Sequence, residues 1–113
     1  MLKYLHRIHH IGIKVDNIPE PFSPIIEKYY GTENAYVFKD NNIAIEYVKF
    51  NKETGIQNGV YHICYEVNNI ENTLKHINKG YKKISPVITS DVWKKKIIYL
   101  FSKSNGFMEL IEK

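Results

Sequence analysis

Two stretches of the chain alternate between apolar and polar residues, which is the pattern of a half-buried β-strand. They cover residues 10–15 and 62–67. Because alternate residues of a strand face the same side, each stretch has one apolar side and one side that begins with a histidine, His10 or His62. The apolar sides are Ile11, Ile13 and Val15 in the first stretch and Ile63, Tyr65 and Val67 in the second.

Further runs rich in β-branched and aromatic residues predict five more strands. We place them at residues 34–39, 43–50, 81–88, 96–102 and 107–111. Turn-forming residues separate two of the pairs, at Asp40-Asn41-Asn42 and at Ser104-Asn105-Gly106, which predicts a hairpin in each part of the chain.

A helix is expected after each alternating stretch. Asn69 can cap the second helix, which carries Ile70, Leu74 and Ile77 on one face and ends at Gly80. Ser23 and Pro24 are typical of the first positions of a shorter helix over 25–30, before Gly31.

These elements recur because the chain carries an internal repeat. Residues 10–18 and 62–70 match at five of nine positions, and a ring residue, His9 or Tyr61, precedes each. A polar linker over residues 51–58 separates the two halves. Neither half can bury its apolar face alone, so the halves should pack together. We predict one α+β domain over residues 1–113, with half-modules at about 1–54 and 55–113 that share a curved sheet.

The repeat brings a histidine and a glutamate to equivalent places in each half. His10 and His62 begin the alternating strands, and Glu46 and Glu109 lie inside apolar runs of the last strand of each half. Taken singly, each histidine is most simply a structural residue and each glutamate an exposed carboxylate. A mid-strand carboxylate is nevertheless costly if it is buried unpaired, and glutamate is a poor strand former. Two imidazoles and two carboxylates on one face would suit a divalent metal such as Mn, Fe, Co, Ni or Zn, with positions left open for a substrate.

Composition and charge narrow the class of protein. The 113 residues are 43% hydrophobic and 25% charged, as expected of a soluble globular protein, and no apolar run reaches the roughly 20 residues that span a bilayer. Cys64 is the single cysteine, so we expect a cytoplasmic protein without an intrachain disulfide. The net charge is +4, and the lysines at 82–83 and 94–96 indicate either a protected edge strand or a site for a phosphate-bearing small molecule. We expect no nucleic-acid and no membrane partner.

Three segments resemble the vicinal oxygen chelate superfamily, also called the glyoxalase/bleomycin-resistance/dioxygenase fold. They are residues 9–15 (HHIGIKV), 61–70 (YHICYEVNNI) and 106–112 (GFMELIE), and the first two are most similar to methylmalonyl-CoA epimerases. The resemblance covers nearly the whole chain. It implies two paired βαβββ modules that form a curved mixed sheet, a homodimer, and a divalent metal held by His10, Glu46, His62 and Glu109.

The resemblance implies three alternative functions. The first is a metal-dependent epimerase or isomerase in which the metal polarises a carbonyl, for example of an acyl-CoA, while Glu46 and Glu109 transfer the proton. The second is a glyoxalase I-like lyase, since Lys14 stands where that enzyme tends to carry arginine. The third is a metal-free, drug-sequestering binding protein, against which the intact histidine and glutamate set argues. Asn34 occupies the place where the epimerases can carry a further acidic residue.

Overall fold

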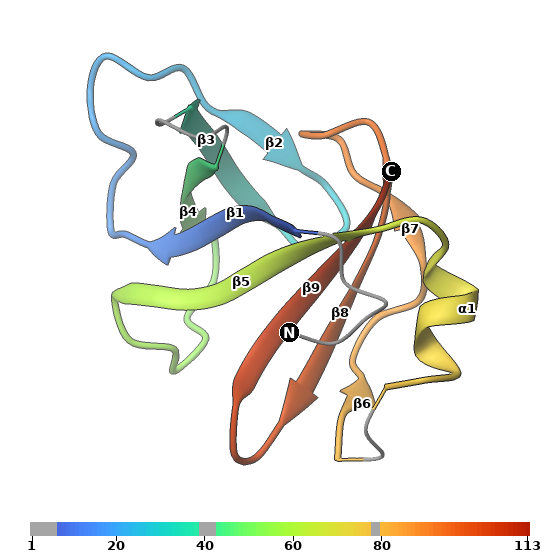
Figure 1. The fold of residues 1–113 in the computed structure, drawn as a ribbon. Coiled ribbons are helices and arrows are strands. Elements are labelled where there is room, and N and C mark those ends of the chain that lie inside the picture. Colours follow the sequence, from blue (N-terminus) through green and yellow to red (C-terminus); the bar gives the residue numbers. More distant parts are fainter. Residues whose placement is uncertain (1–6, 39–42, 78–79) are drawn as a thin grey trace.

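The computed structural model describes residues 7–38, 43–77 and 80–113, and in these residues nine strands form one mixed sheet (Figure 1). The first half contributes β1 (Arg7–Lys14), β2 (Ile25–Glu27), β3 (Thr32–Phe38) and β4 (Ala44–Phe50). The second contributes β5 (Gly59–Val67), β6 (Lys82–Lys83), β7 (Ile88–Thr89), β8 (Lys96–Ser102) and β9 (Gly106–Glu112). The order is β2-β3-β4-β1-β5-β9-β8-β6, with β7 also paired to β8. This curved mixed sheet confirms the predicted fold class.

The two halves of the sheet are built alike around its centre. Strands β1 and β5 pair antiparallel, and each has the last strand of its own half on its other side, in parallel: β4 beside β1 and β9 beside β5. The expected linker over residues 51–58 connects β4 to β5. The sheet curls, so that β3 and β4 rise on one side of the central pair and β8 and β9 extend on the other (Figure 1).

The side of the central strands that carries His10 and His62 is called here the inner side of the curled sheet. It is buried more deeply than the apolar side of the same strands. In β5, His62, Cys64 and Glu66 are buried, whereas Ile63 and Tyr65 are only half-buried. The polar residues of the repeat therefore lie inside the protein, where each needs a partner.

The predicted second helix forms as α1 (Ile70–Leu74), and the side chain of Asn69 caps it by accepting a hydrogen bond from the Asn72 N–H at 2.8 Å. It ends at Leu74 rather than near Gly80 because Asn72 and Thr73 are weak helix formers. Its apolar face packs on β5, β8 and β9 in a core of Val67, Ile70, Ile98, Leu100, Met108 and Leu110. Within the described ranges, no helix has the length and apolar composition needed to cross a membrane.

The helix predicted over residues 25–30 is wrong, since β2 and a single turn occupy this segment. Ile25 and Ile26 are β-branched and pair with Asn34 and Glu33 of β3, which is the conformation such side chains favour. Only one helical turn follows, closed by a hydrogen bond from the Gly31 N–H to the Glu27 carbonyl oxygen.

The strand predicted over residues 81–88 is also wrong as a continuous element. The short strands β6 and β7 replace it, and both pair with β8. Pro86 cannot donate to a strand ladder, and the Ser85 hydroxyl accepts a hydrogen bond from the Tyr99 N–H, so the strand breaks here. The lysines of β6 lie at the edge of the sheet, as the interpretation of a protected edge strand predicts.

Of the two predicted turns, Ser104-Asn105-Gly106 forms, with Gly106 at a φ of 75°. The Asp40-Asn41-Asn42 turn lies outside the described residues.

A buried carboxylate ties the first half to the loop between β7 and β8. Glu27 at the end of β2 accepts hydrogen bonds from the Ser90 hydroxyl, at 2.6 Å, and from the Asp91 N–H. The Lys28 N–H in turn donates to the Asp91 carboxylate at 2.9 Å. These bonds join the edge strand β2 to the loop that carries Trp93 and fix that loop.

Candidate metal centre

The structure brings together the four residues that the repeat singles out. His10 on β1, Glu46 on β4, His62 on β5 and Glu109 on β9 point to one place on the inner side of the sheet. One nitrogen or oxygen atom of each lies within 4.8 Å of the others, and the residues are at most 2% exposed.

The strand register explains this convergence. In the first half Gly12 lies opposite Glu46, and in the second half Cys64 lies opposite Glu109. Gly12 and Cys64 each follow the histidine of their own half by two residues, so they lie on the same side of their strand as that histidine. Each half thus presents one histidine and one glutamate in the same arrangement.

The donor atoms are spaced as ligands of one ion would be. Glu109 Oε1 lies 3.0 Å from Nε2 of both histidines, and Glu46 Oε1 lies 3.3 Å from Nε2 of His10 and 3.7 Å from Nε2 of His62. The two Nε2 atoms are 3.1 Å apart. Bonds of about 2.1 Å to a first-row ion place neighbouring ligands about 3.0–3.4 Å apart, and imidazole with carboxylate is a donor set that such ions accept. The residues therefore fit a divalent metal.

The charges within the cluster stabilise one another. Burial disfavours the charged form of His10, yet the Cys64 sulfur and the carboxylates of Glu109 and Glu46 raise its pKa well above the usual range. Burial likewise disfavours the charged form of Glu109, but the two histidines hold the pKa of its carboxyl below the usual range. Glu109 therefore remains a carboxylate, the form that binds a cation.

Gly12 makes room for His62 between the central strands. A Cβ atom at position 12 would lie 2.7 Å from Nε2 of His62 and closer still to Nδ1 and Cε1. Only a residue without a side chain leaves the imidazole in this place, so the glycine of the His-Ile-Gly-Ile segment is part of the site.

Glu46 is held from behind by two polar residues of β3. The Asn34 amide donates to Glu46 Oε2 at 3.2 Å, and the Asn34 carbonyl oxygen accepts from the Thr32 hydroxyl at 2.6 Å. All three residues are buried. Asn34 thus orients the carboxylate of Glu46 and leaves its Oε1 directed at the histidines.

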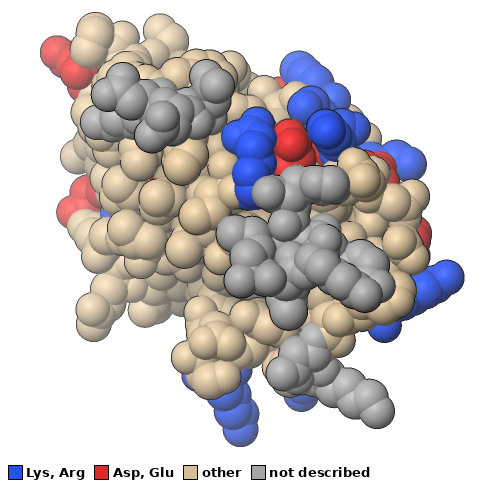
Figure 2. Space-filling view, viewed as in Figure 1, with Lys and Arg blue, Asp and Glu red and all other residues tan. Residues whose placement is uncertain are grey.

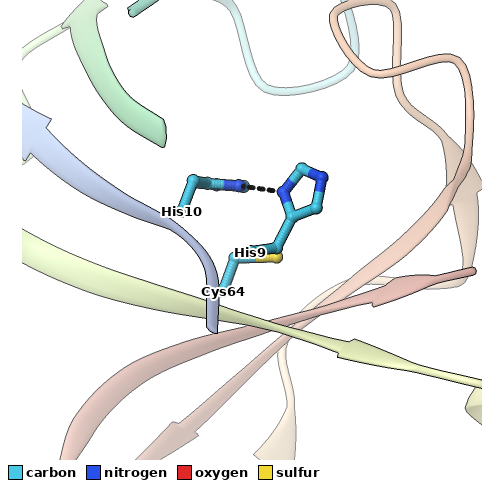
Figure 3. A group of neighbouring side chains, drawn as sticks. All are labelled: His9, His10 and Cys64. Atoms are coloured by element: carbon cyan, nitrogen blue, oxygen red, sulfur yellow. Dashed lines mark hydrogen bonds between the residues drawn. The ribbon is translucent and has the colours of Figure 1, made fainter. Parts of the chain in front are cut away.

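His10 has partners on every side of its ring. Its Nδ1 lies 2.9 Å from Nδ1 of His9 (Figure 3), and Cys64 lies beside the same two imidazoles. The Trp93 ring stacks on the imidazole at a centroid distance of 4.8 Å. Burial, together with the charges of His10 and Arg7, lowers the pKa of His9 to about 4, so that His9 is neutral near pH 7.

His62 has a different environment. No described residue bonds to its buried Nδ1, and Tyr61 only places its ring edge-on at a centroid distance of 4.4 Å. The Tyr99 hydroxyl lies 3.5 Å from Nε2 of His62, on the side of the cluster.

A cavity of about 110 Å³ opens beside the two glutamates. Five aromatic rings and three carboxylates contribute to its wall. The residues that line it are Glu27, Tyr30, Thr32, Asn34, Glu46, Phe50, Ile56, Tyr61, Ile84, Tyr99, Phe107 and Glu109. A small molecule in this cavity would touch Glu46 and Glu109 directly.

Sequence reasoning missed the roles of Glu27, Trp93 and Tyr99. Glu27 falls within the predicted helix over residues 25–30, and the residues next to it in the sequence do not indicate the loop between β7 and β8 that it binds. Tyr99 lies opposite Glu109 in the β8–β9 pair, but this register is not visible before the strands are paired. Cys64 is fully buried, and burial raises the pKa of its thiol far above the usual range, so it is no nucleophile.

Comparison with known proteins supports the fold. No family model and no curated protein matches the sequence. Among solved structures, the chain is similar to a crystal structure of methylmalonyl-CoA epimerase with selenomethionine, with a TM-score of 0.71 and 12% sequence identity over 99% of this chain and 98% of that one. The chain therefore shares the fold of this epimerase, and this is the fold that the sequence resemblance implies.

Proposed function

We propose that this chain is a metal-dependent epimerase or isomerase that moves a proton at a carbon next to a carbonyl group. The observation that carries the proposal is the buried set of His10, Glu46, His62 and Glu109, of which the two glutamates line a small cavity. A divalent ion held by these four residues would act as a Lewis acid that polarises the carbonyl oxygen and acidifies the neighbouring C–H bond. Its identity would be one of Mn, Fe, Co, Ni or Zn.

The two glutamates are proposed to carry the proton. Epimerisation needs a base that takes the proton from one face of the carbon and an acid that returns it to the other. Glu46 and Glu109 come from different halves of the sheet and both line the cavity, so both can contact a bound substrate. Asn34 supports the orientation of Glu46 through its 3.2 Å hydrogen bond.

The cavity supports an uncharged reacting group. Its lining among the described residues contains three glutamates and neither lysine nor arginine. Its volume of about 110 Å³ suits a short acyl or keto group. Apart from the proposed metal ion, a carboxylate on the reacting group would meet no positive side chain in this lining.

A second part of the substrate is proposed to lie in an adjoining groove. Tyr30 and Phe50 line both the cavity and a groove of about 400 Å³, to which Lys28 and Lys52 contribute. Two ammonium groups there would attract a phosphate-bearing handle such as that of an acyl-CoA. On the face shown in Figure 2, basic side chains gather in the upper right around acidic ones, and others lie at the right and lower edges.

The proposal is tested by metal analysis followed by deuterium exchange. We expect the purified chain to bind about one divalent ion and, in deuterated water, to exchange the α-proton of a short acyl-CoA, with chelation abolishing the exchange. Lys28→Ala with Lys52→Ala should raise KM, whereas Lys103→Ala, in the β8–β9 turn, should not. Bound metal without exchange on acyl-CoAs or small ketones would contradict the proposal, and turnover of a hemithioacetal instead would move the assignment to a glyoxalase I-like lyase.

A further inference from the structure

The two histidines of the cluster occupy equivalent positions in the repeat, but only one has a partner for its second ring nitrogen. His10 Nδ1 lies 2.9 Å from Nδ1 of His9, whereas Nδ1 of His62 is buried without a partner among the described residues. The residue before His62 is Tyr61, whose ring has no acceptor in that place. The fold therefore does not require a histidine immediately before the ligand histidine, so the presence of His9 before His10 needs a separate explanation.

The geometry at His10 leaves one arrangement of protons that is compatible with a bound cation. Nε2 of His10 lies within 3.0–3.3 Å of His62, Glu46 and Glu109, so this nitrogen must keep its lone pair free when an ion is present. Nδ1 of His10 then carries the proton. At 2.9 Å, one of the two Nδ1 atoms must donate and the other accept, so His9 is the acceptor.

We propose that His9 is a positioning residue for the metal centre: it accepts a hydrogen bond from Nδ1–H of His10 and thereby fixes the tautomer and the ring orientation of that ligand. The proposal rests on the proposed metal-dependent function. Partners of this kind are usually carboxylates or backbone carbonyl groups, and they commonly contribute 10- to 100-fold in metal affinity.

The surroundings of His9 support this role. The His9 ring is buried and meets the Trp93 ring edge-on at a centroid distance of 4.7 Å, while Trp93 stacks on His10. The indole therefore contacts both imidazoles and holds their relative orientation. The loop that carries Trp93 is tied in turn to Glu27 through Ser90. A fixed acceptor positions its donor more accurately than a mobile one would.

The experiment compares two substitutions of His9 in the full chain, with Co²⁺ titration as the readout. His9→Leu removes the acceptor and should weaken Co²⁺ binding 10- to 100-fold. His9→Asn places an amide oxygen about where Nδ1 lies and should retain affinity within about threefold of the wild type. His76→Leu, two residues beyond α1, removes a histidine that is not part of the cluster and should leave Co²⁺ affinity unchanged. Unchanged affinity in His9→Leu, or equal losses in His9→Leu and His9→Asn, would overturn the proposal.

A second measurement needs no substitution. In the Zn²⁺-loaded wild-type chain, ¹⁵N NMR of the histidines should show a proton on Nδ1 of His10 and none on Nδ1 of His9. A proton on Nδ1 of His9 would overturn the inference while leaving the proposed function intact. Failure of the wild-type chain to bind Co²⁺ or Zn²⁺ would contradict the proposed function and this inference with it.

Discussion

The substitution Gly12→Ala tests whether the exact position of His62 matters to the site. Gly12 lies on β1 opposite His62 of β5, and its backbone is outside the left-handed region, so alanine can adopt the same conformation. The added methyl group is therefore the whole perturbation. It would lie 2.7 Å from Nε2 of His62, the atom that faces the other three ligands.

The expected effect follows from the distances. Ordinary contact with a Cβ atom begins at 3.4 Å, so Nε2 must move by at least about 0.7 Å, and Nδ1 and Cε1 by more. Metal–ligand bonds tolerate about 0.2 Å, so His62 would no longer be a ligand. We expect divalent metal to bind at least 100-fold more weakly, which is about 2.7 kcal/mol. Overpacking of this kind also costs about 1–3 kcal/mol of folding stability.

The assay is a Co²⁺ titration of the wild type and of the variant, with thermal unfolding measured in parallel. Gly55→Ala in the linker is the control, because Gly55 has a φ of 75° and open space around its Cα. It should cost about 1 kcal/mol of stability through backbone strain and leave metal affinity unchanged. If Gly12→Ala binds Co²⁺ as tightly as the wild type while folded, the reasoning about His62 is refuted.

Three further outcomes can be measured. Glu109→Gln should lower Co²⁺ affinity more than Glu46→Gln, because Glu109 Oε1 lies 3.0 Å from both histidines and Glu46 Oε1 lies 3.3 and 3.7 Å away; equal losses in the titrations would contradict this. Burial raises the pKa of Glu27 above 4.5 in the folded protein. As the pH rises from 4.5 through that pKa, the free energy of unfolding of the wild type should therefore fall relative to that of Glu27→Gln. Parallel pH profiles of the two proteins in urea unfolding would contradict this. Cys64 should resist a thiol reagent in the native protein and react fully in denaturant, and rapid native labelling would show that the thiol is reachable.

The strands of the repeat could be predicted from the sequence because their alternation is local. Where local and distant preferences disagree, the prediction failed. Ser23, Pro24 and Gly31 are good helix boundaries, yet Ile25 and Ile26 pair with β3. Strand pairing therefore outweighed the local helix signal. Pairing partners are set by the whole topology, which no short window of sequence contains.

The four candidate ligands could be proposed from the sequence because duplication places them twice. A single histidine or glutamate gives no such signal, which is why Glu27, Trp93 and Tyr99 were missed. Each contacts a partner distant in sequence, such as Ser90 for Glu27 and His62 for Tyr99. Contacts of this kind become visible only once the curled sheet has brought its two halves together.

The duplication leaves one difference between the two halves, which the proposed chemistry would use. The register gives each half the same histidine and glutamate, but the residues behind them differ. Glu46 has its second oxygen on Asn34, while Glu109 lies between the two histidines at the shortest distances. Two carboxylates in different environments have different proton affinities, so one can act as the base while the other acts as the acid. The unequal surroundings of the two glutamates are therefore suited to the two-sided proton transfer that we propose.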